Sequence, residues 1–273
     1  MNVKQHNWLM IAFLVALAIW IWMHDLTWME SLNDTIPILL ALPIAWWLGQ
    51  PWQRRHKAEA FAMSSLNLGV GIFVMGVVTN LTLLMTMGLV YMLYRFIQSH
   101  YRVEGSPLKR LMTLPLLAFP WIANDFSTLG WWFRLSGAWL SAQLFSFTGL
   151  AVDQQGTFVT VEGLPVSVEA ACSGLNLLQS LLIAGTALAL LKLPYCPRFW
   201  FAIILLPLIA WATNTIRIIF ITVLALTFGI EFASGLFHTW GGLLVIVLMF
   251  VVCWKLFEWL KTSTSNQSNP VDP

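Results

Sequence analysis

Long apolar runs alternate with short polar segments along almost the whole chain, and this pattern predicts membrane helices. Uninterrupted runs of roughly 17 to 25 apolar residues have the length that crosses a bilayer. The runs are Trp8–Met23, Ile36–Leu48, Ala60–Val78, Leu81–Ile97, Leu108–Ala123, Leu175–Leu191, Phe199–Thr227 and Thr239–Leu260. We therefore expect an all-α polytopic membrane protein with about eight transmembrane helices.

The boundary between the third and fourth runs consists of only Thr79 and Asn80. One helix through both runs would extend about 57 Å at about 1.5 Å per residue, far beyond a bilayer core of about 30 Å. A tight hairpin is expected here instead. The second and fifth runs are shorter and contain two prolines each, which leaves their limits less defined.

The basic residues give these helices an orientation. With eight crossings, the flanking Lys and Arg residues all fall on one side: Lys4, Arg54, Arg55, Lys57, Arg95, Arg102, Lys109, Arg110, Lys192, Arg198 and Lys261. Basic residues are enriched in cytoplasmic loops. We therefore expect a multi-pass protein of the cytoplasmic (inner) membrane with both termini in the cytoplasm. The acidic loops then fall on the extracytoplasmic side.

The stretch Leu129–Leu150 is also apolar, but Arg134 and several Ser, Thr and Gln residues interrupt it. If it crossed the membrane, Lys192 and Arg198 would move to the extracytoplasmic side, against the charge pattern. A helix in the extracytoplasmic interface is the expectation that fits both observations.

A short polar segment precedes the sixth run. Thr157–Val161 and Pro165–Val168 contain several β-branched residues and flank Glu162-Gly163, which predicts a short β-hairpin. The expected organisation is a single integral membrane domain (1–261) with N-terminal spans (1–128), an interfacial segment and hairpin (129–168) and a three-helix half (169–261), followed by a disordered cytoplasmic tail (262–273).

Composition agrees with a membrane protein and excludes other classes. Hydrophobic residues make up 59% of the chain and charged residues only 10%, whereas a soluble domain carries about 25% charged residues. The 16 tryptophans suit repeated crossings of the membrane–water boundary. A net charge of +2 is too small to suggest a nucleic-acid-binding protein, and the basic residues are scattered in short loops. The first run lacks a small-residue cleavage site and is expected to be a retained span.

Cys172 stands in the segment Glu169–Asn176, where the polar segment meets the sixth run. A helix start offers unpaired N–H groups and the positive end of the helix dipole, which favour a thiolate. On the expected topology Cys196 lies in a cytoplasmic loop and Cys253 inside the last span, so neither is a disulfide partner. Cys172 is then either a nucleophile or a small residue whose sulfur only packs.

Two further residues, Arg217 and His238, are expected at the same depth in the membrane as Cys172. Arg217 lies inside the seventh run, about 27 Å of helix from Phe199, and a charge within a span costs at least about 2.5 kcal/mol. Asn214 lies one turn earlier on the same face, and His238 opens the last run. With the cysteine, these residues have the chemistry of a nucleophile, an acid/base and an oxyanion stabiliser. The alternatives are a structural arginine, paired with an acid such as Glu169, and an ordinary interfacial histidine.

The order of these residues resembles the exosortase/archaeosortase family. The resemblance rests on Ala171-Cys-Ser-Gly-Leu175 before one membrane helix, Asn214-x-x-Arg217-Ile within the next and His238 at the start of the one after. It implies an eight-span membrane cysteine transpeptidase that removes a C-terminal sorting signal: a Pro-Glu-Pro-like motif, a membrane helix and a basic tail. The implied roles are nucleophile for Cys172, stabiliser for Arg217, acid/base for His238 and support for Asn176 and Asn214.

The implied reaction is acyl transfer through a thioester. The expected partners are the lipid bilayer, membrane-anchored protein substrates with the sorting signal and a glycan or lipid acceptor; no nucleic acid, metal or cofactor is expected. Three other functions stay open. The first is a protease that only hydrolyses. The second is a non-enzymatic component of polysaccharide export, with Arg217 on an anionic headgroup. The third is an acyl- or glycosyltransferase with His238 as base, which leaves Cys172 unexplained.

Overall fold

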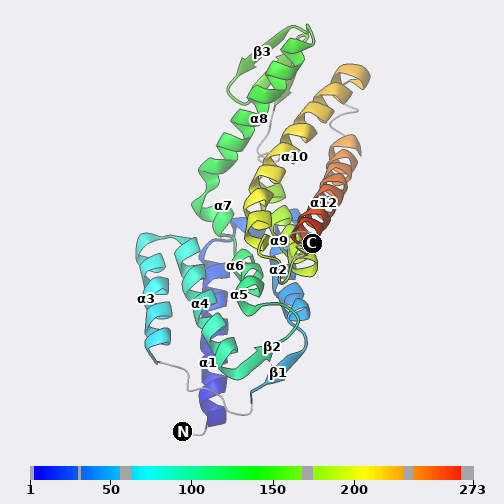
Figure 1. The fold of residues 1–273 in the computed structure, drawn as a ribbon. Helices are drawn as coiled ribbons and strands as arrows, with labels where there is room; N and C mark the ends of the chain where they lie inside the picture. The colour runs from blue at the N-terminus through cyan, green and yellow to red at the C-terminus, as the bar shows by residue number, and fades with distance from the viewer. Residues whose placement is uncertain (1–2, 30–31, 56–62, 168–174, 230–235, 266–273) are drawn as a thin grey trace, which may run out of the picture. The chain divides into compact units, whose positions relative to one another are not determined.

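The protein is described here from a computed structural model that covers residues 3–29, 32–55, 63–167, 175–229 and 236–265. Helices make up 77% of the structure. Figure 1 shows the helices and strands, coloured along the chain. The chain divides into two compact units. Unit 1 consists of Met1–Phe126 and Thr186–Phe199, and unit 2 of Ser127–Gly185 and Trp200–Pro273. Each unit is described by itself below.

Long helices occupy all of the predicted apolar runs except the fifth. They are α1 (Val3–His24), α2 (Leu32–Leu48), α3 (Met63–Thr79), α4 (Thr82–His100), α9 (Leu175–Lys192), α10 (Phe199–Phe228) and α12 (Leu236–Ser265), with a short 3-10 helix η1 (Thr27–Met29) after α1. Helix α8 (Ser127–Phe147) covers the stretch expected in the interface. The mostly helical class is therefore confirmed.

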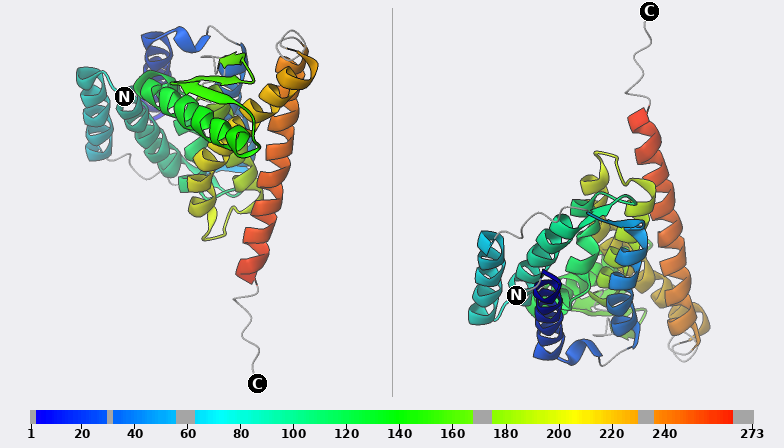
Figure 2. Two further views of the ribbon diagram at one scale, coloured as in Figure 1. Left: turned by 90° about the horizontal axis from the view of Figure 1, so that it is seen from above. Right: turned by 90° about the horizontal axis from the view of Figure 1, so that it is seen from below.

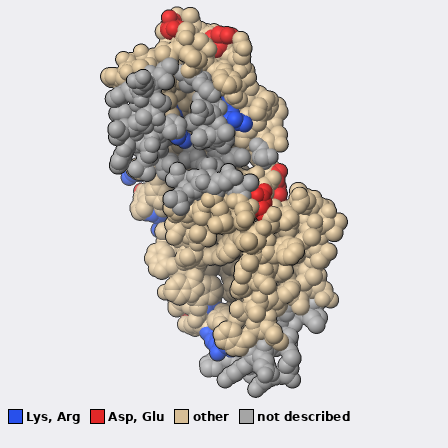
Figure 3. All heavy atoms as spheres, turned by 180° about the vertical axis from the view of Figure 1, so that it is seen from behind, with Lys and Arg blue, Asp and Glu red and all other residues tan. Residues whose placement is uncertain are grey.

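Two of the described helices, Asn7–His24 and Phe199–Phe228, are long and apolar enough to cross a membrane by length and composition. Thr35–Leu48, Leu66–Thr79 and Leu178–Lys192 are shorter apolar helices. In the view of Figure 3 most of the described surface carries neither Lys, Arg, Asp nor Glu, and the charged side chains form a few small groups. The number of crossings stays a prediction.

The fifth predicted span is wrong as a single helix. The structure has three short helices there, α5 (Leu108–Leu111), α6 (Thr113–Leu117) and α7 (Trp121–Asp125). Proline is the physical reason, since Pro115 and Pro120 have no N–H for the helical ladder. Two carbonyl groups of this broken segment accept hydrogen bonds from tryptophan indoles: Leu116 from Trp121 at 2.7 Å and Ala118 from Trp22 at 3.0 Å.

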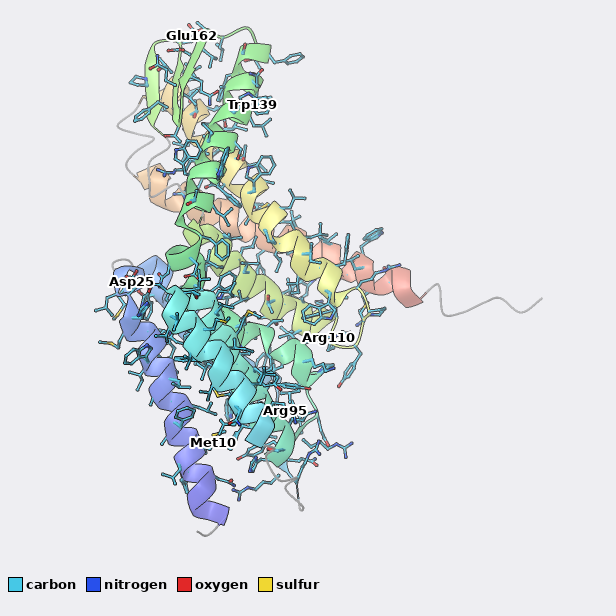
Figure 4. The ribbon with its side chains drawn as sticks, turned by 90° about the vertical axis from the view of Figure 1, so that its left-hand side faces the viewer. Met10, Asp25, Arg95, Arg110, Trp139 and Glu162 are labelled. Atoms are coloured by element: carbon cyan, nitrogen blue, oxygen red, sulfur yellow. The ribbon has the colours of Figure 1, made fainter. Side chains whose placement is uncertain are left out.

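In unit 1, α1 and α4 run side by side in opposite directions. At one end His100 Nε2 lies 3.1 Å from Asn7 Oδ1, and at the other His24 Nε2 lies 2.9 Å from Asn80 Oδ1. Figure 4 shows Met10 and Arg95 toward the first end and Asp25 at the second. Hydrogen bonds at both ends therefore fix the register of the two helices.

The connection between α3 and α4 is the tight hairpin that the sequence predicts. Asn80 turns the chain in the left-handed region with φ 56°. Glycine lets the two helices touch, because a Cβ added to Gly88 would lie 2.7 Å from both the Gly69 carbonyl oxygen and the Phe73 backbone nitrogen. Both neighbours are backbone atoms, so the contact has no flexible side chain that could move away.

One end of unit 1 gathers several of the basic loops. Strand β1 (Trp52–Arg54) pairs antiparallel with β2 (Tyr101–Val103) directly after α4. The Tyr195 hydroxyl donates to the Glu104 carbonyl oxygen at 3.1 Å, which brings the loop between α9 and α10 to the same end. The sequence interpretation assigned all of these loops to one side.

The opposite end of unit 1 carries Asp125, which caps α4. Its Oδ1 accepts from the Thr82 N–H at 2.9 Å and its Oδ2 from the Leu83 N–H at 2.6 Å. The carboxylate thus satisfies two of the orphan donors of the α4 N-terminus and complements the helix dipole. The segment between Glu104 and Asp125 consequently runs from the end of α4 to its beginning, although its helices are broken.

Unit 2 contains a small antiparallel sheet in the order β3-β4-β5: β3 (Val152–Gln155), β4 (Phe158–Val161) and β5 (Leu164–Ser167). β4 and β5 stand where the hairpin is predicted, and Glu162 (φ 53°) and Gly163 (φ 79°) form the left-handed turn between them. β3 is an addition that the sequence interpretation did not include. Figure 2 shows the strands beside α8.

One face of this sheet is part of a hydrophobic core. Val159 and Val161 are buried against Ala138, Ala142 and Phe145 of α8 and Ile218 of α10. Glu162, in the turn between β4 and β5, holds this end of the sheet to the segment before β3, because its carboxylate accepts a hydrogen bond from the Ala151 N–H at 2.6 Å. The sheet, α8 and the C-terminal half of α10 therefore form one packed body.

Candidate functional site

The structure describes some of the predicted site residues fully, others only in part, and Cys172 not at all. Cys172 lies outside the described residues. Asn176 belongs to the first turn of α9 and His238 to the first turn of α12, but neither side chain is described. Arg217 and Asn214 lie on α10 and are described in full. The grouping of Cys172, Arg217 and His238 therefore stays a prediction, and the geometry of α10 is what bears on it.

A buried polar layer interrupts the apolar sequence of α10. Thr213, Asn214 and Thr215 are each at most 3% exposed. The two threonine hydroxyls donate to carbonyl oxygens of their own helix, Thr213 to Ile209 at 2.6 Å and Thr215 to Trp211 at 3.0 Å. Polar groups within an apolar helix are costly unless they bond or act. This layer lies within one turn of Arg217.

Arg217 is half-buried, and its Nε atom is fully buried. Across the part of the chain that the structure describes, no group accepts a hydrogen bond from that Nε. A buried N–H group that loses water without gaining an acceptor is unfavourable. The arrangement therefore suits an arginine that meets an anionic group when a ligand or a reacting peptide is present.

The contact between α9 and α10 shows which way Arg217 faces. A Cβ on Gly185 would lie 2.5 Å from a methyl carbon of Leu206, so the two helices touch there. Leu206 and Arg217 are eleven positions apart, which is three turns and returns to the same face. Arg217 therefore lies on the α10 face that α9 contacts.

The contact between Gly185 and Leu206 also shows which part of α9 lies beside Arg217. Gly185 lies seven residues before the end of α9 and Leu206 seven residues after the start of α10, as expected for antiparallel neighbours joined by a short loop. From this contact, Arg217 is about 16 Å along α10, and the first residue of α9, Leu175, is about 15 Å along α9. Arg217 is therefore level with the start of α9.

Helix α8 packs closely against α10 through small residues. A Cβ on Gly137 would lie 3.0 Å from Ile218 Cδ1 and 3.5 Å from Thr215 Oγ1. Nearby, the Trp211 indole donates to the Ser136 hydroxyl at 2.9 Å. The contacts advance together along both helices, so α8 and α10 run parallel. The interface location expected for α8 stays a prediction; one of its faces is occupied by α10.

The sequence contains a signal for this packing. Gly137 and Ser141, and Ala138 and Ala142, are pairs of small residues four positions apart. This spacing is typical of close helix contacts in membranes. Arg134, which the sequence interpretation used only as an interruption of the apolar run, lies one turn before Ala138 on the same face.

The described residues do not form a metal-binding cluster. Within the described ranges, no three His, Cys, Asp or Glu side chains gather in a group that could hold one. Cys196 and Cys253 carry thiols, on the loop after α9 and inside α12. The chemistry available on the described part of α10 is that of a cation beside hydroxyl and amide groups.

A protein-family model described as transmembrane exosortase matches residues 28–255, well over half of the chain. The matched range includes α8, α9, α10 and most of α12, together with the positions of Cys172, Arg217 and His238. No curated protein and no solved structure matches the chain.

Proposed function

The chain belongs to the transmembrane exosortase family, whose members have a membrane transpeptidase or protease role, and we propose that it is a cysteine transpeptidase of the cytoplasmic membrane. It cleaves the C-terminal sorting signal of membrane-anchored exported proteins and transfers them to a glycan or lipid acceptor at the cell surface. The observation that carries the proposal is the position of Arg217, which lies on the α10 face that contacts α9, at the level where α9 begins; α9 begins three residues after Cys172.

In the proposed reaction the Cys172 thiolate attacks the carbonyl carbon of the scissile peptide bond and a C–S bond forms. Arg217 stabilises the oxyanion of the tetrahedral intermediate. The C–N bond then breaks, and the His238 imidazolium gives its proton to the leaving amine, which departs with the membrane anchor. The acceptor attacks the thioester, His238 takes the acceptor's proton, and the C–S bond breaks to regenerate the thiolate. Asn176 and Asn214 support this site.

The proposed topology has eight crossings, with both termini in the cytoplasm and the site on the extracytoplasmic face. Unit 1 supports it, because loops assigned to the cytoplasm meet at one end of α4 while Asp125 caps the other. The broken segment α5–α7 links these two ends, so it counts as one crossing without being one helix. Broken backbone at membrane depth is tolerated where protein buries it, and Leu111, Leu114, Ala118 and Ile122 are all at most 2% exposed.

The decisive experiment is co-expression with a reporter protein that carries a sorting signal, a membrane helix and a basic tail. We expect the wild-type protein to shorten the reporter and Cys172→Ala to leave it uncut. Cys196→Ala removes a thiol from the loop after α9 and is expected to keep activity. A reporter-linked thioester trapped at Cys172 would support the chemistry, and normal processing by Cys172→Ala would overturn it.

Mass spectrometry of the reporter's new C-terminus distinguishes transfer from hydrolysis, because transfer leaves an adduct and hydrolysis a free acid. Arg217→Gln tests the oxyanion role. Removing one such donor typically lowers kcat by about 10²–10³-fold, whereas an arginine that only binds an anionic headgroup would leave reporter cleavage near its wild-type rate.

A further inference from the structure

We propose that the outer edge of strand β5 binds the substrate as an added β-strand, so that the peptide near the scissile bond is held by its backbone. The inference rests on the proposed function and adds to it how the peptide is bound. Three observations support it: the register of the sheet, the proline in β5 and the short chain segment between β5 and Cys172.

Strand β5 is an edge of the three-stranded sheet. The strand order is β3-β4-β5, and within the described ranges no strand pairs with the outer side of β5. Helix α8 packs mainly against β3 and β4. An edge strand has N–H and C=O groups without strand partners, and these groups pair readily with another extended chain.

The turn between β4 and β5 determines which groups of β5 point outward. It consists of two residues, Glu162 and Gly163, with φ 53° and 79°. The pair that flanks such a turn is hydrogen-bonded, and bonded and non-bonded pairs then alternate along antiparallel strands. The first and third residues of β5 therefore bond to β4. The second and fourth, Pro165 and Ser167, direct their backbone groups to the outer edge.

Pro165 agrees with this register and limits what the edge can bind. Proline has no N–H, so it is tolerated in a strand where the N–H would point away from the neighbouring strand. Pro165 stands opposite Thr160 of β4, in a non-bonded pair. The outer edge thus offers the carbonyl groups of Pro165 and Ser167 but only the N–H of Ser167. A short edge that contains a proline is a poor template for a long strand and suits a short peptide.

The strand beside β5 is held firmly. Val159 and Val161 of β4 are at most 2% exposed and belong to the core with α8 and Ile218 of α10. The Glu162 carboxylate also accepts from the Ala151 N–H at the turn. An edge that is already in its binding conformation loses little conformational freedom when a peptide pairs with it.

The chain itself keeps β5 close to the proposed nucleophile. Ser167, the last residue of β5, precedes Cys172 by five residues. A chain extends by at most about 3.6 Å per residue, so the two backbones lie within about 18 Å of each other whatever path the segment between them takes. An extended peptide advances about 3.3 Å per residue. A peptide paired with Ser167 therefore reaches Cys172 within about five residues.

Strand addition predicts a period of two along the peptide. In both parallel and antiparallel pairing, only every second residue of the added strand directs its N–H and C=O to β5. Two peptide N–H groups, two residues apart, donate to the Pro165 and Ser167 carbonyl oxygens, and one peptide carbonyl accepts from the Ser167 N–H. These bonds fix the register of the peptide without reading its side chains.

The test measures binding of labelled peptides to the Cys172→Ala protein in nanodiscs, so that it does not depend on turnover. The peptides cover the sorting signal of the reporter without its membrane helix, and each carries one N-methyl group on a different backbone nitrogen. Nanodiscs without protein correct for binding to lipid. Methylation removes the donor and fills the space of its acceptor, so two positions two residues apart should each lose about tenfold in affinity. The position between them should stay within about twofold of the unmodified peptide.

A substitution in β5 tests the same contact from the side of the protein. Ser167→Pro removes the N–H of the outer edge and keeps the pairing with β4, so it should weaken the unmodified peptide about three- to tenfold. A peptide already methylated at a sensitive position should lose little more, because the two changes affect one contact. If Ser167→Pro is poorly folded, the peptide series alone decides, since it leaves the sheet unaltered.

The matched control makes the same change on the other edge of the sheet. Gln154 of β3 stands opposite Val159, whose backbone groups bond to β5. The backbone groups of Gln154 therefore point to the outer edge of β3. We expect Gln154→Pro to leave the affinity of every peptide within about twofold.

Three results would overturn the inference. Methylation that weakens every position equally, or none, would show that the peptide does not bind as a strand. Weakening by Gln154→Pro in place of Ser167→Pro would assign the peptide to β3. A dimer that Ser167→Pro converts to a monomer, with peptide binding unchanged, would show that β5 pairs with a second copy of the chain. Failure of the proposed function is a separate result, namely that the alternating pattern is present but the wild-type protein never cleaves the reporter.

Discussion

Replacement of Arg110 by alanine should destabilise unit 1 strongly. One terminal nitrogen of this side chain, Nη1, donates to three carbonyl oxygens of the loop after α9: Leu193 at 3.0 Å, Pro194 at 2.7 Å and Cys196 at 2.8 Å. The guanidinium carbon also lies 5.1 Å from the ring centre of Phe199, which is fully buried. A cation at the C-terminal end of a helix further complements the helix dipole.

The size of the effect follows from these contacts. A hydrogen bond to a charged group contributes about 1.5–3 kcal/mol, and a nitrogen with two N–H groups supplies two full bonds among the three acceptors. A cation–π contact adds roughly 0.5–1 kcal/mol. We therefore expect Arg110→Ala to lower the free energy of unfolding by about 3.5–7 kcal/mol, which is roughly 7–28 °C in melting temperature at about 2–4 °C per kcal/mol.

The assay is thermal unfolding of detergent-purified protein, followed by tryptophan fluorescence. Arg102→Ala is the control, because this side chain is 74% exposed and its ion pair with Glu104 is 3.8 Å long; exposed pairs contribute about 0–1 kcal/mol. Arg110→Lys keeps the charge but loses the planar fork, so it should fall between the two. Equal melting temperatures for Arg110→Ala and Arg102→Ala would refute the reasoning.

Three further substitutions test the fold. Gly88→Ala should lower the melting temperature because its Cβ would meet the backbone of α3, whereas Gly71→Ala, with nothing within 4 Å, should not; equal shifts would contradict the close packing. Asp125→Ala should cost about 1–2 kcal/mol by uncapping α4, and the exposed Asp153→Ala should cost less, both measured by thermal unfolding. Gly137→Leu should force α8 away from α10 and reduce both folded yield and reporter cleavage, and a fully active variant would show that this contact is unimportant.

Sequence periodicity predicted most of the helices because a long apolar run has few alternatives to a membrane helix. It failed in the fifth run, where hydropathy counts Pro115 and Pro120 as tolerable although each removes a helical hydrogen bond. It also missed β3, since Val152–Gln155 contains a single apolar residue, although Gly156 marks the turn that follows it. Pairing with β4 makes it a strand, and pairing is not visible in a local pattern.

The sequence could predict those residues of the candidate site that are unusual in their local sequence. Arg217 is conspicuous because a charge in an apolar run needs a reason. The buried polar layer around it and the role of Gly137 are not, because Thr, Asn and Gly occur freely in membrane helices. Which face of a helix meets which neighbour is decided by packing, and the contacts at Gly185 and Gly137 show two faces of α10 that the sequence pattern does not reveal.

The length of α10 explains why the proposed site needs α8 and the sheet. At 30 residues the helix extends about 45 Å, some 15 Å more than a bilayer core of about 30 Å. On the proposed topology the excess is the part after Arg217, which would meet water on every side if it stood alone. The packed body of α8, β4 and Ile218 covers one face of this part. Arg217 itself lies on the face of α10 that α9 contacts, so α8 and the sheet support the helix that carries this arginine and do not cover the guanidinium directly.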